Sequence, residues 1–377
     1  MKLIGKIIMI MNIGIITFHN AVNYGAVLQC YALKEYLKIH GGNVYVVNYC
    51  NKDLLSCYKA FDRHRFIRRE KPLIMVRRLF SELSLITSRI KRNYKFHKFV
   101  VGQLNLLEPT IENINKLDLI VIGSDQVWNT KLTRGFDDYY WGNFCHSEKT
   151  RLISYAASIE EFWDAKEDHV AKHLLAAFDS ISVREAKAVH RISDLLPENN
   201  INLSVDPTLL IDKGIWGKIA KKPSVKEPYL LVYQVRPSEK VCKIAEVVAE
   251  QLSLKIVYLS ADVAGLNSSC CRSASPEEYL GLFKYASFVV CSSFHGTVFS
   301  LIFSKPFISV KLNDGKDSRV ETLLMQFNAQ HRFLSDYKDI YKLKDLMEII
   351  EYSSSVSESS KKYLLNYLCK NEDIIYT

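Results

Sequence analysis

The fold is decided by the stretch Val289-Val290-Cys291-Ser292-Ser293-Phe294-His295-Gly296-Thr297-Val298-Phe299. A short β-branched run passes into a polar turn with one histidine, and an apolar continuation follows. This pattern is typical of a buried parallel strand that feeds a helix. In an open α/β sheet, the turn after such a strand faces the ligand crevice. The sequence therefore predicts a ligand-binding position that includes Ser292, Ser293, His295 and Thr297.

The first half of the chain carries a similar alternation of strands and helices. A buried strand is predicted over 13–17, and a polar loop leads from it into a helix over 26–39. The next strand, 44–49, completes a β-loop-α-β unit of a doubly wound sheet. Two more strands, 117–122 and 152–157, follow. The first of these runs into polar residues that we expect at the edge of the crevice.

The pattern restarts after a polar passage rich in Lys and Pro, 213–228, which we interpret as an interdomain linker. Strand, helix, strand and helix are then predicted over 229–235, 239–252, 255–259 and 276–285. The fold class is therefore α/β, with two Rossmann-like domains that face each other across a cleft. We place an N-terminal domain at 1–222, a C-terminal domain at 223–350, and a C-terminal helix that crosses back onto the first domain at 351–377.

Several classes of protein leave signatures that this sequence lacks. Neither G-x-G-x-x-G after the first strand nor G-x-x-x-x-G-K-[ST] is present, so no dinucleotide or P-loop fingerprint occurs. The nine cysteines are scattered and form no C-x-x-C pair, which argues for a reducing compartment and against a zinc site. No window reaches the ~18 apolar residues of a membrane span. We interpret the apolar start, 1–16, as a strand with a short leader, and expect a cytoplasmic protein.

Positive charge is concentrated in one segment, 59–98, which we predict to be a helical insertion. It contains thirteen Lys and Arg against three acidic residues, and the whole chain has a formal net charge of +9. One interpretation is a solvated helical face. The other is an anionic membrane surface as partner, which would place the protein peripherally on the inner face of the cell membrane. No nucleic-acid-binding motif accompanies the charge, so nucleic acid is not an expected partner.

Six motifs keep their order between residues 12 and 330. They are Asn23-Tyr24-Gly25-Ala26-Val27-Leu28-Gln29, Gly123-Ser124-Asp125-Gln126-Val127-Trp128-Asn129, Ser154-Tyr155-Ala156-Ala157-Ser158, Val183-Arg184-Glu185, Val205-Asp206-Pro207-Thr208-Leu209-Leu210 and Ser292-Ser293-Phe294-His295-Gly296-Thr297. Each alone is a weak signal, but the ordered set resembles the polysaccharide pyruvyl transferase family. Only the basic insertion and the C-terminal tail lie outside the resemblance.

The resemblance implies a fold like that of GT-B glycosyltransferases and a transferase activity. Pyruvate would pass from phosphoenolpyruvate, the donor substrate, to two hydroxyls of a saccharide as a ketal, with release of phosphate. Members of the family act in the biosynthesis of capsules, exopolysaccharides and cell-surface glycans. Many act on lipid-linked saccharides, so a polyprenyl-diphosphate-linked acceptor is one expectation. Neither a cofactor nor a metal is expected.

The motifs and the needs of this chemistry give the candidate residues. An anionic donor requires cations and helix N-terminal amides, its methylene carbon requires a general acid, and the attacking hydroxyl requires a base. His295 is the candidate acid and Asp125 the candidate base. The predicted donor site comprises Arg184, Ser292, Ser293, His295, Gly296, Thr297 and Arg319. The predicted acceptor site comprises Asn23, Tyr24, Ser124, Asp125, Gln126 and Trp128.

One position departs from the family pattern. Some family members read Arg-Leu-His where this chain has Ser293-Phe294-His295, so the cation for the same donor must come from elsewhere. Arg184 is the first candidate, and the alternative is that it pairs with Glu185 or Asp206. Arg319 is the second, because an arginine at a helix start opposes the helix dipole unless an anion lies nearby. We interpret Asp206-Pro207 as a structural turn.

Two other functions stay open from the sequence. A glycosyltransferase that uses a nucleotide sugar would share the same fold and cleft. A non-catalytic saccharide-binding protein would share them too, but it would not need His295 as an acid.

Overall fold

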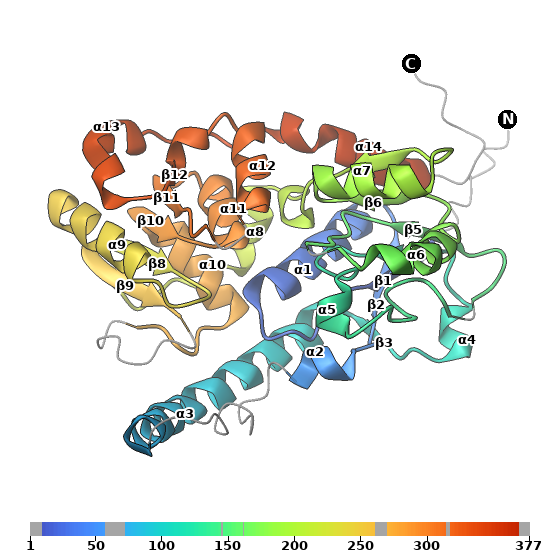
Figure 1. Cartoon of the computed structure of the whole chain (residues 1–377), viewed down its shortest axis with the longest axis horizontal. Helices are drawn as coiled ribbons and strands as arrows, with labels where there is room; N and C mark the ends of the chain where they lie inside the picture. Colours follow the sequence, from blue (N-terminus) through green and yellow to red (C-terminus); the bar gives the residue numbers. More distant parts are fainter. Residues whose placement is uncertain are drawn as a thin grey trace, which may run out of the picture.

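The computed structural model describes residues 10–56, 72–144, 146–160, 162–260, 270–313 and 317–368. Two parallel sheets form the centres of two α/β domains that lie side by side (Figure 1). The N-terminal sheet has the strand order β3-β2-β1-β4-β5. Its strands are β1 (Asn12–Ile16), β2 (Asn43–Val47), β3 (Leu106–Leu107), β4 (Leu119–Ile122) and β5 (Arg151–Ser154). A further parallel pair, β6 (Ile181–Val183) and β7 (Ile201–Leu203), is joined to the segment around β5 by single bridges.

The apolar runs of the N-terminal sheet explain its place in the core. All four residues of β4 are buried, and β1 is buried from Ile13 onward, as expected of parallel strands covered on both faces. Helix α1 (Tyr24–Ile39) packs against this sheet. It begins two residues earlier than the sequence predicted, because the Asn23 side chain caps it by accepting a hydrogen bond from the Gly25 amide.

The C-terminal sheet has the strand order β12-β11-β10-β8-β9. Its strands are β8 (Tyr229–Tyr233), β9 (Lys255–Leu259), β10 (Phe288–Cys291), β11 (Phe307–Val310) and β12 (Phe333–Leu334). The central strand β10 is buried along its whole length and pairs in parallel with β8 and β11. It feeds directly into α11 (Phe294–Ile302), which confirms the strand-turn-helix prediction. The α/β class with two Rossmann-like domains is confirmed as well.

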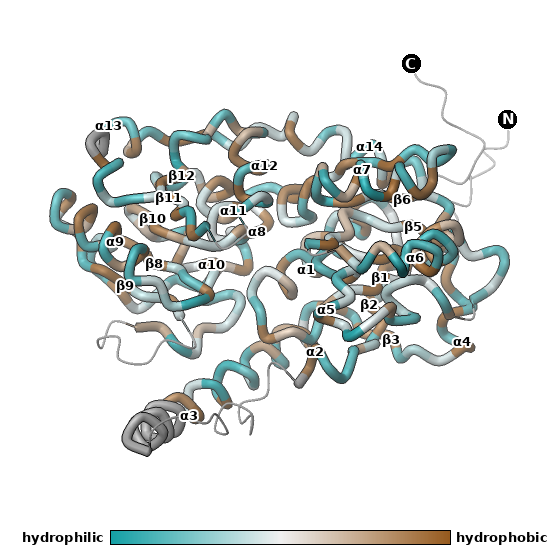
Figure 2. Tube along the Cα trace, in the orientation of Figure 1, coloured by the Kyte–Doolittle hydropathy of each residue, from teal (hydrophilic) through white to brown (hydrophobic). Residues whose placement is uncertain are grey.

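Amphipathic helices surround the two sheets, and several of them, such as α9, alternate polar and apolar segments along their length (Figure 2). The α-helices not yet given are α2 (Lys52–Ser56), α3 (Pro72–Gln103), α4 (Ile111–Ile114), α5 (Thr130–Thr133), α6 (Asp168–Leu175), α7 (Ala186–Leu195), α8 (Lys213–Ile219), α9 (Glu239–Leu252), α10 (Pro276–Tyr285), α12 (Ser318–Gln326), α13 (Leu343–Leu346) and α14 (Glu358–Leu368). The 3-10 helices are η2 (Ala165–Glu167), η3 (Pro207–Leu209), η4 (Gln330–Arg332), η5 (Tyr337–Lys342) and η6 (Ser354–Ser357).

The passage between the domains differs from the simple linker that the sequence predicted over 213–228. It begins with helix α8, which Asp212 caps by accepting hydrogen bonds from the amides of Gly214 and Ile215. Trp216 anchors this helix, since its side chain is fully buried and its indole N–H donates to the carbonyl of Thr208. The Trp216 ring contacts Tyr31 of the first domain and Phe299 of the second. The segment is therefore part of the interdomain core.

Helix α14 lies against the first domain (Figure 1). The Tyr363 hydroxyl donates to the carbonyl of Ser154 at the end of β5, at 2.8 Å. The Ser360 hydroxyl accepts a hydrogen bond from the Val205 amide. The chain thus passes from the first domain to the second and back. The exact boundaries, 1–222, 223–350 and 351–377, stay a prediction.

The described part of the basic insertion is the long helix α3, whereas residues 59–71 lie outside the described residues. The C-terminal half of α3 is anchored to the body. Arg92 donates to the carbonyl of Val22 and lies over the Tyr24 ring, and Lys95 forms an ion pair with Glu278 of the second domain at 2.5 Å. Arg92 and Lys95 therefore attach this helix to the body of the protein. Among the described residues, no helix combines the length and the apolarity needed to cross a bilayer.

Candidate functional site

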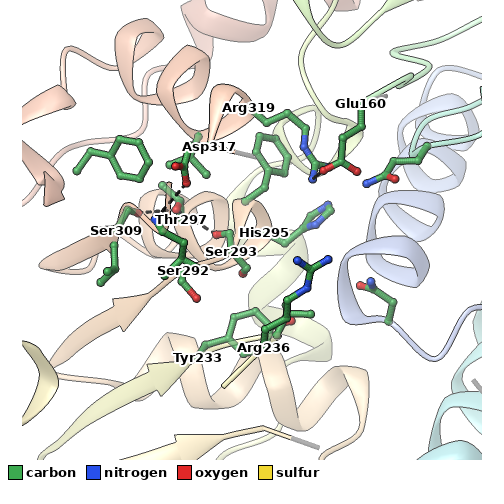
Figure 3. A pocket seen from close by; sticks show the side chains of 18 of the residues that line it. Glu160, Tyr233, Arg236, Ser292, Ser293, His295, Thr297, Ser309, Asp317 and Arg319 are labelled. Atoms are coloured by element: carbon green, nitrogen blue, oxygen red, sulfur yellow. Dashed lines mark hydrogen bonds and ion pairs between the residues drawn. The ribbon is translucent and has the colours of Figure 1, made fainter. Parts of the chain in front are cut away.

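A cavity of about 290 Å³ lies between the two domains, at the carboxyl ends of β8, β10 and β11. This is the position where open α/β sheets bind ligands. Figure 3 shows the side chains around it. From the first domain the polar lining residues are Asn23, Asp125, Gln126 and Glu160. From the second domain they are Tyr233, Arg236, Ser292, Ser293, His295, Thr297, Ser309, Asp317 and Arg319.

The N-terminus of α11 forms one wall of this cavity. Ser293 is its N-cap residue, and the side chain accepts a hydrogen bond from the Gly296 amide at 3.0 Å. The first amides of the helix and the positive end of its dipole therefore meet the cavity, which favours an anion there. Thr297 is fully buried and shares a 2.5 Å hydrogen bond with Ser309. Its hydroxyl therefore links α11 to β11 in the cavity wall and is already engaged.

Gly296 is a correction to the predicted donor site. It does not line the cavity, because it is packed inside the first turn of α11. A Cβ at this position would lie 2.9 Å from the Cβ of Cys291 and 3.0 Å from the Tyr233 ring. The glycine is needed for close packing of helix on strand.

His295 reaches across the cleft to the first domain. Its ring lies so close to Gly25 that a Cβ there would be 2.0 Å from Nδ1. On the other side, Nε2 lies 3.5 Å from Oδ2 of Asp206, at the outer limit of a hydrogen bond. The side chain is only 13% exposed, and Nε2 forms no hydrogen bond with any described residue. The histidine is thus held between the start of α1 and a buried carboxylate.

Arg184 lies behind this cavity and lines a small neighbouring one of about 20 Å³ with Phe294 and Arg319, so its role as a donor ligand stays a prediction. Its side chain is 3% exposed, and Nη1 donates to Oδ2 of Asp206 at 2.6 Å. The carboxylates of Asp125 and Glu185 lie 3.7 Å from the same guanidinium. The physical reason is electrostatic: a buried guanidinium in this position is required to balance buried carboxylates.

Asp206 is the residue that the sequence reasoning missed. The predicted turn exists, since Oδ1 accepts hydrogen bonds from the amide and hydroxyl of Thr208 and starts η3. The same fully buried carboxylate also faces Arg184 and His295. Burial raises the pKa of Asp206, but the charges of His295 and Arg184 and the Thr208 hydroxyl outweigh burial and lower it overall. An aspartate followed by proline gave no signal beyond a turn.

Arg319 lies in the cavity wall. The anion expected near this helix start is Glu160 of the first domain, whose carboxylate pairs with Nη2 of Arg319 at 2.9 Å. The Phe294 ring lies between this guanidinium and that of Arg184, with centroid distances of 5.9 and 5.1 Å. A second arginine, Arg236, lies just after β8 at the cavity mouth. Its place after a strand was a usable sequence signal.

Three residues predicted for the acceptor site are corrected, because they lie in the core. Tyr24 is stacked on Tyr279 and donates to the carbonyl of Ala274, and burial raises the pKa of Tyr24 to about 12. Ser124 and Trp128 are fully buried and donate to the backbone carbonyls of Ala156 and Tyr140. These three side chains are held by burial and by their hydrogen bonds to backbone carbonyls. The other predicted acceptor residues, Asn23, Asp125 and Gln126, do line the cavity.

The chemistry of the cavity is that of an anion site beside carboxylates. The described residues contain no cluster of three or more His, Cys, Asp or Glu side chains suited to a metal ion. Two arginines, one histidine and a helix N-terminus face Asp125, Glu160 and Asp317 across the same space. Such a site can hold an anionic group and move a proton at a neighbouring atom.

The fold and this cleft define a two-domain α/β protein of GT-B-like architecture, with a polar site between its Rossmann-like domains. The family model for polysaccharide pyruvyl transferase matches residues 23–314, and the chain belongs to that family. No curated protein matches the chain.

Solved structures of other proteins are similar in fold at low sequence identity. A UDP-N-acetylglucosamine 2-epimerase is 12% identical, with 96% of this chain and 97% of that chain covered and a TM-score of 0.50. The Staphylococcus aureus MnaA–UDP co-structure is 10% identical, with 96% of each chain covered and a TM-score of 0.49. The first likeness supports the two-domain fold and nothing beyond it.

Proposed function

We propose that this protein transfers pyruvate from phosphoenolpyruvate to two hydroxyls of a saccharide, in the biosynthesis of a capsule, exopolysaccharide or other cell-surface glycan. The observation that carries the proposal is the position of His295. In a member of this family, a histidine stands at a helix N-terminus inside an interdomain cavity that also contains two arginines. This arrangement suits an anionic donor that must be protonated.

The donor would bind on the α11 side of the cavity. The first amides of α11 and the hydroxyls of Ser292 and Ser293 suit the phosphate, and Arg319 and Arg236 suit the carboxylate and the remaining charge. Arg319 is paired with Glu160 in this structure. A donor carboxylate would therefore share or replace that partner. This pair of arginines is our proposal for the cation that Ser293 does not supply.

The reaction would proceed by proton transfer and two additions of hydroxyl. His295 gives a proton to the methylene carbon, which becomes a methyl group, and the neighbouring carbon gains oxocarbenium character. One sugar hydroxyl adds to this carbon and loses its proton to a base, for which Asp125 is the candidate. The second hydroxyl then replaces the phosphate, so the C–O bond to phosphate breaks and inorganic phosphate leaves. Its proton departs with phosphate or solvent, and the ketal is complete.

The saccharide acceptor would enter from the first domain. Asn23 and Gln126 offer amide groups at the cavity wall, beside the carboxylate of Asp125. Side-chain amides and carboxylates are suitable partners for sugar hydroxyls because they accept and donate hydrogen bonds in fixed directions. A polyprenyl-diphosphate-linked saccharide is the acceptor class that we propose, in the cytoplasm. No cofactor enters this scheme.

Helix α3 is the proposed contact with an anionic membrane surface. Ile90, Tyr94 and Val101 are 56%, 67% and 57% exposed and share one helical face, and the exposed Lys91 and Lys98 lie beside them. Apolar side chains next to lysines favour the interface of an anionic bilayer. Co-sedimentation with phosphatidylglycerol vesicles, but not with phosphatidylcholine vesicles, is expected. The double substitution Ile90→Glu/Tyr94→Glu should abolish it.

The decisive assay combines the purified protein, phosphoenolpyruvate and candidate lipid-linked saccharides. We expect phosphate release together with a pyruvate-sized mass gain on one acceptor. His295→Ala should lower the rate at least ~100-fold, as expected for loss of a general acid. Arg319→Ala should chiefly raise the KM for phosphoenolpyruvate. Binding of a nucleotide sugar without phosphate release would favour the glycosyltransferase alternative. Saccharide binding without either reaction would favour the non-catalytic one.

A further inference from the structure

We propose that Glu160 is a built-in competitor of anionic ligands in the interdomain cavity: its carboxylate occupies the guanidinium of Arg319, and a ligand anion binds that guanidinium by displacing it. The inference deepens the proposed function and rests on it for the identity of the ligand, phosphoenolpyruvate. It assigns a role to a residue that lies outside all six sequence motifs.

Glu160 reaches the cavity from the first domain, on the loop that follows β5. Its φ angle of 52° lies in the left-handed region, which is uncommon for a residue with a Cβ atom. The side chain is 7% exposed, so its carboxylate is largely withdrawn from water. A strained backbone and a buried charge both cost free energy. Pairing with Arg319 offsets part of that cost, and Figure 3 shows the two side chains pointing toward each other.

The guanidinium of Arg319 meets the cavity on the side where Glu160 lies. Nη2 of Arg319 donates to Oε1 of Glu160 at 2.9 Å. Nε is buried and forms no hydrogen bond with a described residue, and the centroid of the Phe294 ring lies 5.9 Å from the guanidinium carbon. A ligand in the cavity therefore reaches this guanidinium at its terminal nitrogens, where the carboxylate already lies.

The other carboxylates of the cavity wall have different partners. Asp125 lies 3.7 Å from the guanidinium of Arg184, behind the cavity. Asp317 accepts hydrogen bonds from two backbone amides. Among the described residues, Glu160 is thus the wall carboxylate that neutralises Arg319.

This pairing lowers the affinity of the cavity for anions. Two anions beside one guanidinium repel each other, so Glu160 and a ligand anion cannot both bind Arg319 at full strength. The cavity therefore binds an anion less tightly than its arginines and the N-terminus of α11 alone would bind it. In the proposed reaction both the donor and the released phosphate are anions. A site that bound every anion tightly would retain its product.

The test is isothermal titration calorimetry of the full-length protein with inorganic phosphate and, separately, with phosphoenolpyruvate. Glu160→Gln keeps the size of the side chain and an oxygen for Nη2 of Arg319, but it removes the charge. The Kd for each anion should fall by about tenfold or more, as expected when a competing charge is removed. The matched control is Glu278→Gln, which neutralises the interdomain ion pair with Lys95, outside the cavity lining. It should leave both Kd values unchanged.

A double variant shows whether Glu160 acts through Arg319. When Arg319→Gln is already present, the further change Glu160→Gln should leave the Kd for phosphate nearly unchanged. Three outcomes would overturn the inference: a phosphate Kd that does not fall in Glu160→Gln, one that falls equally in Glu278→Gln, or one that falls as much in the double variant.

A crystal structure of the wild-type protein with phosphate in the cavity is a further test that needs no variant. Nη2 of Arg319 should contact a phosphate oxygen, and the Glu160 carboxylate should no longer lie within ion-pair distance. Phosphate bound in the cavity beside an intact pair would contradict the proposal. These tests can be decided with inorganic phosphate alone. Absence of pyruvate transfer would therefore reject the proposed function and leave the phosphate result unaffected.

Discussion

Gly25 shows how one residue of the first domain shapes the site of the second. Gly25 belongs to the first turn of α1. This position requires a glycine because the His295 ring occupies the space that a larger side chain would need. We expect Gly25→Ala to displace the ring and lower kcat by ~10- to 100-fold, the range of a misplaced general acid. Steady-state kinetics would measure this. The control is Gly102→Ala in α3, where an added Cβ meets nothing within 4 Å.

Asp206 also links the stability of the fold to pH. Burial disfavours its charge, yet His295, Arg184 and Thr208 lower the pKa of Asp206 in the folded protein. A carboxyl of this kind stabilises the fold above its unfolded pKa of about 3.9, and the stabilisation is lost as pH falls toward the folded value. The free energy of unfolding, from urea titrations, should therefore fall more steeply below about pH 4 in the wild type than in Asp206→Asn. Parallel slopes would count against this coupling.

Some residues of the site could be placed at the cavity from the sequence alone, and others could not. Ser292, Ser293 and His295 follow a strand that is apolar throughout, so their place at the crevice was predictable. Pairing of Arg184 with Asp206 was one alternative from the sequence, and the structure has it, but the approach of Asp206 to His295 was not predictable because only the tertiary fold brings these two residues together. A motif shows that residues belong to a family, but it does not separate cavity walls from their support.

The start of helix α11 explains why serine suits position 293, where the sequence departs from the family pattern. Where family members have arginine, Ser293 caps the helix and bonds to the Gly296 amide. Ser293→Ala should therefore lower the free energy of unfolding by about 1 kcal/mol, as typical for a lost N-cap. Ser293→Thr keeps a capping hydroxyl and should have a much smaller effect. Chemical denaturation of both variants would show whether the hydroxyl is needed.

Strands and long helices were predictable as elements, whereas helix α8 was not. The apolar runs of β4, β8 and β10 are buried along their length, so period and composition indicated them directly. Helix α8 has seven residues in a passage rich in Lys and Pro, where local propensity indicated a linker. The burial of Trp216 between the domains outweighs that propensity, and a single sequence does not reveal such a contact.

At the level of the whole molecule, one hydrophobic core cluster spans both domains, and each domain has a further cluster of its own. A continuous buried cluster contains Val27 and Tyr31 of α1 together with Tyr279 and Phe299 of the second domain. Trp216 lies within this cluster. A shared core predicts one cooperative unfolding transition for both domains.

Substitution of Trp216 tests this shared core. Trp216→Ala should lower the free energy of unfolding by about 3–5 kcal/mol, the usual range for a buried large aromatic residue. Ile349→Ala serves as control, because that side chain is 58% exposed. Differential scanning calorimetry would measure both variants. Two separate transitions in the wild type would contradict the expectation.

The return of α14 to the first domain has a mechanical consequence. The chain crosses between the domains once near α8 and again before η6, so the second domain is tethered at two places. A body attached at one point can swivel in any direction, whereas a body attached at two can turn only about the line that joins them. Any change of angle between the domains would then be a rotation about the line through the two crossings, and such a rotation would return His295 to the same place beside Gly25.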